Sequence, residues 1–366
     1  MAGERLRHIK GRFGPWPSPW SLATLLAAAA AGYGAYRLHV PLAWILGPLV
    51  AVAVASMCGL PIFAPLAGRR FGQVTVGSSI GLNISAAVAL LMLKWLPAMI
   101  VTALTAVVVA AIVSVPFRIL SGLDRQTAYY AMMPGGLSEM ANLGAAAGAR
   151  SEPIAISQAL RVALLVIVLP PLIIALDIHG VENDATAFPQ LGILPTLLVL
   201  ACGGIGVAVA RLARFNNPWM IGALAAAGIL AATGLMSGRL PLPLYWLGQF
   251  LIGISIGSRF QREIVVKLPR VFVSAALFVL VLAALLFGYA AALSWLTGLD
   301  LASATLGASP GGLAEMAITA QTLHLSVGLV TGFHIVRAII VNGFCTHIYR
   351  GLERTGLFDL LEGLRR

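Results

Sequence analysis

Residues 134–141 read Pro-Gly-Gly-Leu-Ser-Glu-Met-Ala, and residues 310–317 read Pro-Gly-Gly-Leu-Ala-Glu-Met-Ala. The two stretches are 176 residues apart (310 − 134), and residues 121–141 and 297–317 share 11 of 21 positions without a gap. The same unit of sequence therefore occurs twice. Because each copy keeps a helix-breaking Pro-Gly-Gly and a carboxylate in an apolar setting, the pattern predicts a membrane site built from two halves.

The duplication extends well beyond this motif. Gly72-Gln73 recurs as Gly248-Gln249 at the same offset, and Trp44 recurs as Trp219 at an offset of 175. These matches divide the chain into a first repeat over residues 20–177 and a second over residues 191–350.

The composition is that of an integral membrane protein. Hydrophobic residues make up 59% of the chain, charged residues 10%, and the mean hydropathy is +0.94, whereas soluble domains carry about 25% charged residues. Each half holds six apolar stretches, which predicts an all-α polytopic protein in contact with the lipid bilayer. The net charge of +11 is explained by loops that set topology and meet anionic headgroups, so no direct binding of nucleic acid is expected.

The distribution of basic residues decides how many stretches cross the bilayer. If the fifth stretch of each half (127–148 and 302–322) crosses, then Arg259 to Arg270 lie outside, which contradicts the positive-inside rule. If it enters and returns, the basic residues gather inside. Five crossings per half then give two inverted-topology repeats, each with a broken or re-entrant Pro-Gly-Gly segment. The third stretch (72–93) is an alternative place for the break.

This topology places the parts of the chain outside the repeats. We expect a cytoplasmic basic tail (1–19), an external acidic loop (178–190) and a cytoplasmic C-terminal tail (351–366). The expected location is the bacterial inner membrane, with both termini cytoplasmic.

The Pro-Gly-Gly breaks predict a binding site. Irregular backbone at membrane depth is tolerated where it is buried in protein or lines a wet cavity, and the N-terminal end of the helix that follows attracts anions. The alternative is a kink that serves packing only. The residues expected to bind substrate or an ion are Gly135, Gly136, Ser138, Glu139, Asn142, Gly311, Gly312, Glu315 and Thr319.

Glu139 and Glu315 are the carboxylates of the two copies. Ionisable residues inside a bilayer usually face a pathway or a partner, so these two are candidates for binding Na⁺, exchanging a proton or holding a substrate. The alternative is a carboxylate at a helix start that complements the helix dipole.

Arg161 and Arg337 lie 22 residues after these glutamates (161 − 139 and 337 − 315). Each arginine suits an anionic group on a substrate or a structural ion pair with the glutamate. Gln158 and His334 precede them by three residues and share a helix face with them.

No motif for an enzyme is present in the sequence. The six histidines do not cluster at metal-ligand spacing, and neither a phosphate-binding glycine loop nor a nucleophile elbow occurs. We therefore expect no catalytic residues, no bound metal and no cofactor apart from coupling to Na⁺ or H⁺.

The duplicated motif, the Gly-Gln element at 72–73 and Trp-Ile-Leu-Gly-Pro at 44–48 resemble the bacterial AbrB family of membrane proteins. The resemblance covers roughly Leu22 to Arg350. Members are labelled as ammonia monooxygenases, as regulators of gene expression or as transporter-like proteins. The sequence offers no ligand set for the first label, and any regulation implied by the second would be indirect.

Together these features predict an ion- or proton-coupled secondary transporter of a small solute, with an anionic solute as one candidate. The site is expected at the repeat interface. The alternative is a non-transporting membrane sensor that affects gene expression indirectly. An oligomer is left open.

Overall fold

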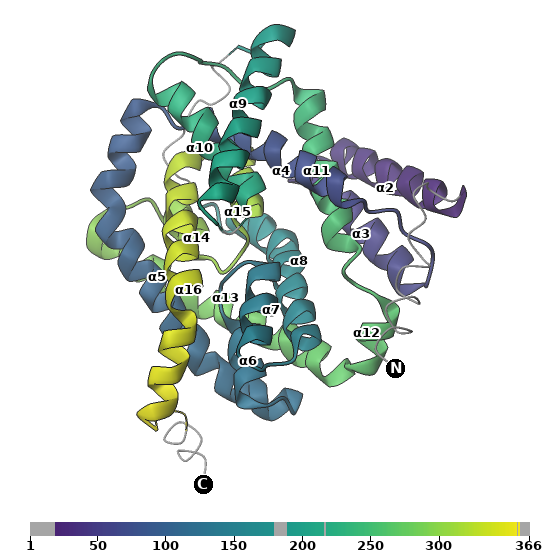
Figure 1. Cartoon of the computed structure of the whole chain (residues 1–366), viewed down its shortest axis with the longest axis vertical. Helices are drawn as coiled ribbons and strands as arrows, with labels where there is room; N and C mark the ends of the chain where they lie inside the picture. The colour runs from purple at the N-terminus through teal and green to yellow at the C-terminus, as the bar shows by residue number, and fades with distance from the viewer. Residues whose placement is uncertain (1–18, 179–188, 216, 357, 359–366) are drawn as a thin grey trace.

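The computed structural model describes residues 19–178, 189–215, 217–356 and 358. Most of the expected tails and of the expected acidic loop lie outside these residues. Nearly all of the described chain is helical (Figure 1). The helices are α2 (Pro19–Arg37), α3 (Ala43–Met57), α4 (Leu66–Gly81), α5 (Ala86–Ser121), α6 (Arg125–Met132), α7 (Leu137–Ala146), α8 (Ser151–Ala175), α9 (Ile193–Leu212), α10 (Pro218–Ala232), α11 (Leu242–Gly257), α12 (Arg262–Lys267), α13 (Pro269–Thr297), α14 (Leu301–Ala308), α15 (Leu313–Thr322) and α16 (Val327–Arg354).

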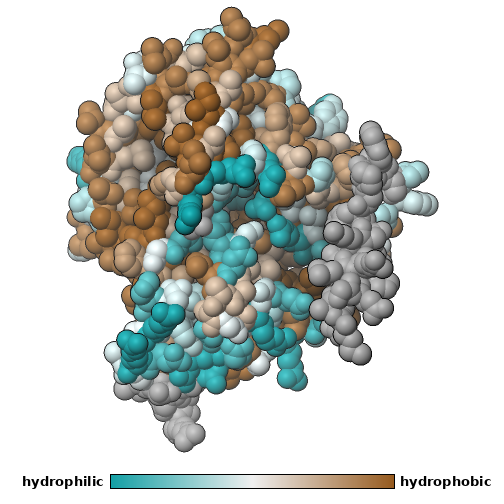
Figure 2. Space-filling model, in the orientation of Figure 1, coloured by the Kyte–Doolittle hydropathy of each residue, from teal (hydrophilic) through white to brown (hydrophobic). Residues whose placement is uncertain are grey.

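Five of the described helices are long and apolar enough to cross a membrane: α5, α8, α9, α13 and α16. Large apolar side chains are exposed along them, among them Leu197, Ile205 and Leu285. Figure 2 shows hydrophobic residues over the upper part of one face, with hydrophilic residues gathered at its centre and below. An apolar exterior of this extent is expected where helices face lipid. The prediction of an all-α polytopic membrane protein is therefore confirmed.

The fifth stretch of each half is a pair of short helices. Asp124 begins α6 by accepting a hydrogen bond from the Thr127 amide at 2.7 Å, and Asp300 begins α14 in the same way with the Ser303 amide at 2.7 Å. A carboxylate at the N-cap satisfies an amide that has no partner within the helix. The helices α6 and α14 then end at Met132 and Ala308, directly before the two Pro-Gly-Gly motifs.

The chain reverses direction at the first of these breaks. The Gln126 side chain, at the start of α6, donates to the Ala147 carbonyl, just after the end of α7, at 2.7 Å. The Arg150 amide donates to the Thr127 hydroxyl at 3.0 Å. The start of α6 therefore lies beside the end of α7, and the two helices form a hairpin whose tip is the Pro-Gly-Gly turn. This hairpin packs against α8 (Figure 1).

The third stretch contains no such break within its helix. α4 is continuous from Leu66 to Gly81, and α5 starts at Ala86. The expected range 72–93 therefore runs across the boundary between two helices, so that boundary was predicted too late in the chain. The break that interrupts an apolar stretch falls in the fifth stretch, as favoured from the sequence.

Helices from one half pack on helices of the other through glycines. A Cβ atom on Gly77 of α4 would lie 2.7 Å from the Met220 carbonyl oxygen of α10, and one on Gly253 of α11 would lie 2.6 Å from the Ile45 carbonyl oxygen of α3. Only glycine permits so close an approach of two backbones. The longer helices also cross between halves, because α16 packs against α5 and α13 against α8.

Candidate functional site

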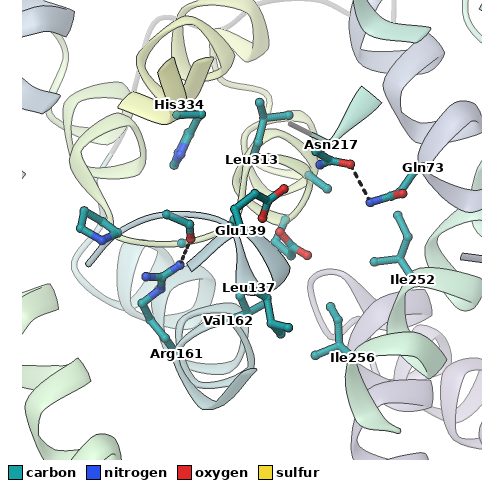
Figure 3. Close-up of a pocket in the computed structure, with 18 of the residues that line it drawn as sticks. Gln73, Leu137, Glu139, Arg161, Val162, Asn217, Ile252, Ile256, Leu313 and His334 are labelled. Atoms are coloured by element: carbon teal, nitrogen blue, oxygen red, sulfur yellow. Dashed lines mark hydrogen bonds between the residues drawn. The ribbon is translucent and has the colours of Figure 1, made fainter. Parts of the chain in front are cut away.

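Both Pro-Gly-Gly breaks line one cavity of about 140 Å³. Its walls come from the hairpin tips, from α8 and α16, and from residues of α4, α10 and α11. In Figure 3 the Glu139 side chain points into this cavity, with Arg161 on one side and Ile252 and Ile256 on another. The structure therefore brings together segments that are 176 residues apart in the sequence.

The two glycines of each motif make room for two specific side chains. A Cβ atom on Gly135 would lie 2.5 Å from the Met140 side chain, and one on Gly311 would lie 2.8 Å from that of Met316. A Cβ atom on Gly136 would collide with the Glu139 carboxylate, and one on Gly312 with that of Glu315. Each carboxylate lies at the third helical position and turns back over the glycine that caps its own helix, where it complements the helix dipole.

The two arginines bind the backbone of the breaks. Arg161, 1% exposed, donates from Nη1 to the Met133 carbonyl at 2.6 Å and from Nη2 to the Gly135 carbonyl at 2.5 Å. Arg337, 5% exposed, donates to the carbonyls of Ser309 and Gly311. All three positions of the second set follow the first at an offset of 176. A charged fork on two carbonyls satisfies backbone groups that the broken helix leaves unpaired.

Gln158 and His334 bind the short helix before each break. Gln158 Nε2 donates to the carbonyls of Tyr130 and Met133 at 3.0 and 2.9 Å. His334 Nε2 lies 3.0 Å from the Leu306 carbonyl, the residue equivalent to Tyr130. Both side chains are buried, but only His334 lines the cavity.

Nine of the residues singled out from the sequence line this cavity. They are Gly135, Gly136, Glu139, Arg161, Gly311, Gly312, Glu315, His334 and Arg337.

Four others lie elsewhere. Ser138 is half-buried and Asn142 is exposed, on parts of α7 that do not line the cavity. Thr319 is buried and donates to the Glu315 carbonyl at 2.8 Å, within α15. Gln158 is the fourth, held by the contacts above.

Sequence reasoning missed four polar residues of the cavity: Arg69, Gln73, Asn217 and Arg259. Gln73 donates to the Asn217 side chain at 3.0 Å and so joins α4 to the start of α10 (Figure 3). Arg69 and Arg259 were counted as loop charges that set topology. The recurrence of Gly-Gln at 248–249 drew attention to Gln73, but nothing in the sequence placed it beside Asn217.

The cavity carries more basic than acidic groups. Arg69, Arg161, Arg259 and Arg337 face two carboxylates, Glu139 and Glu315. Burial, and second the nearby charge of Arg69, lower the pKa of Arg259 below its ordinary value. Like charges held this close in a half-buried site favour binding of an anion.

No group of three or more potential metal ligands (His, Cys, Asp or Glu) occurs in the described part of the chain.

Comparison with known proteins gives the family. Residues 44–353 match the family model described as "Transition state regulatory protein AbrB". The chain belongs to the AbrB family. It is 26% identical over 361 residues to "Uncharacterized protein YhjN" of Bacillus subtilis (strain 168), covering 89% of this chain and 91% of that protein. It is 25% identical over 333 residues to "Putative regulator AbrB" of Escherichia coli (strain K12), covering 88% and 94%.

The resemblance inferred from the duplicated motif is thereby confirmed, and the match includes both Pro-Gly-Gly copies. The names of these AbrB relatives state no substrate and no reaction.

Proposed function

We propose that this AbrB-family protein is an ion- or proton-coupled secondary transporter that carries a small solute through the cavity between its two broken segments. One observation carries the proposal: both breaks, both glutamates and both buried arginines line a single cavity. Transporters with discontinuous helices bind their substrates at such places, near the middle of the membrane. The proposal includes no enzymatic activity and no cofactor beyond the coupling ion.

Equivalent contacts support two inverted repeats. Arg161 and Arg337 bind carbonyls at equivalent positions of the two breaks. The contact of Gly77 with Met220 corresponds to that of Gly253 with Ile45, because 77 + 176 is 253 and 45 + 175 is 220. Such swapped pairs are what a two-fold axis relating the halves would produce. In this arrangement the hairpins are re-entrant segments that enter from opposite sides.

The basic residues support an orientation with both termini in the cytoplasm of a bacterial inner membrane. Arg259 lies at the cavity, and α12, which follows it, carries Arg262 and Lys267. By the positive-inside rule this side is cytoplasmic. The cavity in this structure then opens inward.

Glu139 and Glu315 are the proposed coupling groups. Each carboxylate lines the cavity beside a helix break, and Glu315 is only 8% exposed. A carboxylate so placed can bind a cation or a proton when the solute is bound and release it when the solute leaves.

A non-transporting membrane sensor is the second candidate. It is favoured by the word regulator in the name of the Escherichia coli relative. A sensor would bind solute in the same cavity without moving it, so flux separates the two functions.

The test uses purified protein in sealed vesicles with an imposed Na⁺ or proton gradient. We expect uptake of a solute selected by a thermal-shift screen, and loss of gradient-driven uptake in Glu139→Gln/Glu315→Gln. Glu353→Gln is the control, because Glu353 lies near the end of α16 away from the cavity. Saturable binding without uptake would reject transport, and uptake unchanged by the double substitution would reject the coupling role.

A further inference from the structure

We propose that the cavity binds a short aliphatic carboxylate, with its anionic group held by Arg69 and Arg259. This assignment deepens the proposed function by naming the solute class, and as a statement about binding it does not require that the solute be moved. The argument uses the state of each arginine, the charge of the cavity, its size and its apolar lining.

Arg69 and Arg259 are the arginines of the cavity that the protein leaves free. Both are half-buried, and neither forms a hydrogen bond or an ion pair with any residue that the structure describes. Taking a guanidinium out of water without a partner costs free energy. A ligand that accepts hydrogen bonds from both would recover that cost, and a carboxylate matches the planar fork of arginine.

The deeper arginines have a different task. Arg161 and Arg337 already use both terminal nitrogens on the carbonyls of the two breaks. A ligand that took these donors would leave buried carbonyls unpaired, which is costly. Their charge nevertheless adds to the positive potential of the cavity, so they favour an anion without being its direct partners.

The size and lining of the cavity limit the ligand. An engineered protein cavity of about 150 Å³ holds benzene, so a space of about 140 Å³ suits a ligand of roughly six non-hydrogen atoms. Val162, Ile221, Ile252 and Ile256 provide an apolar wall. A hydrated inorganic anion would leave that wall in contact with water, whereas a short aliphatic chain would cover it.

Butanoate meets these conditions and has a neutral counterpart of the same size, butanamide. The experiment titrates the purified full-length protein in detergent with butanoate, with butanamide and with inorganic phosphate, at constant ionic strength, by isothermal calorimetry. We expect saturable binding of butanoate and at least tenfold weaker binding of the other two. The comparison of butanoate with butanamide uses the unaltered chain, so it does not depend on the folding of any variant.

The residue assignment is tested with neighbouring arginines as controls. We expect Arg69→Gln and Arg259→Gln each to weaken butanoate binding by roughly tenfold to a hundredfold, as loss of a charge-assisted hydrogen bond does. Arg70→Gln and Arg262→Gln remove the same charge from exposed positions outside the cavity, and we expect them to bind butanoate as the unaltered chain does.

Three results would overturn the inference: equal binding of butanamide, stronger binding of phosphate than of butanoate, or no saturable butanoate binding. Equal affinity in Arg69→Gln and Arg259→Gln would overturn the assignment of the arginines. Butanoate binding without butanoate uptake would reject transport and leave this inference standing. Gradient-driven uptake of another solute by a chain that does not bind butanoate would do the reverse.

Discussion

The second glycine of each motif determines where the adjacent carboxylate lies. Gly136 and Gly312 each occupy the capping position of a helix whose third residue is a glutamate. The carboxylate turns back over the glycine so closely that no side chain fits between them. The spacing Gly-Leu-x-Glu therefore encodes a geometry in which an acid is held over a helix N-terminus at the edge of a cavity.

We predict that Gly136→Ala destabilises the protein by about 1–3 kcal/mol, the usual cost of forcing an extra methyl group into a filled space. A lower melting temperature in detergent would measure it. Adding Glu139→Ala removes the group that the methyl meets, so the double variant should lose less than the sum of the two single losses. Additive losses would show that the collision is not the cause.

At this scale the sequence predicted more than half of the cavity. The glycines, glutamates and arginines of the duplicated unit were identifiable because carboxylates and guanidiniums in apolar stretches need a partner or a pathway. Arg69 and Arg259 were not identifiable. Each lies near the end of a short helix, and a basic residue there has an ordinary explanation in topology.

Each broken segment is held by the helix that follows it. In the first half, α8 presents Gln158 and Arg161 to the carbonyls of α6 and of the break. In the second half, α16 presents His334 and Arg337 in the same way. The long helix thus replaces the backbone hydrogen bonds that the Pro-Gly-Gly turn removes, and the hairpin tip keeps a defined shape.

We predict that Arg161→Gln lowers stability by about 2–4 kcal/mol, because two buried carbonyls lose their partner. Arg161→Lys should recover about half of this loss, since an ammonium group lacks the fork that reaches both carbonyls. Melting curves in detergent provide the measurement.

Arg150→Gln is the matched control, because Arg150 is exposed at the start of the same helix. A loss in Arg150→Gln as large as in Arg161→Gln would contradict the account, since the effect would then come from charge and not from the carbonyl contacts.

The helix starts and stops were predicted where the local chemistry is strong. The aspartates before α6 and α14 and the Pro-Gly-Gly breaks are local signals, and the structure confirms both. The boundary between α4 and α5 was misplaced, because Asn83 and Ser85 lie between two apolar segments without proline or glycine to mark a stop.

At the scale of the whole molecule the cavity is asymmetric although the two halves are related in sequence. Ile252, Ser255 and Ile256 of α11 line it. Their equivalents on α4 at the offset of 176 are Val76, Ser79 and Ile80, which are buried and do not line it. Sequence could not predict this difference, because the same duplicated helix serves as a wall in one half and as a packed core element in the other.

In an inverted-repeat carrier the two halves exchange these roles as the site opens to the opposite side. The buried face of α4 should then become the cavity wall in the outward-open state. Ser79 and Ser255 are a matched pair for observing the exchange, because serine to cysteine changes one atom.

The decisive measurement is cysteine labelling from each side of the membrane, using Ser79→Cys and Ser255→Cys in a chain freed of Cys58, Cys202 and Cys345. We predict that a membrane-impermeant maleimide labels position 255 only from the cytoplasmic side and position 79 only from the outside. An imposed ion gradient should raise labelling at one position as it lowers labelling at the other. Labelling of position 255 alone, with position 79 unreactive under every gradient, would contradict alternating access and support a sensor that binds solute without carrying it.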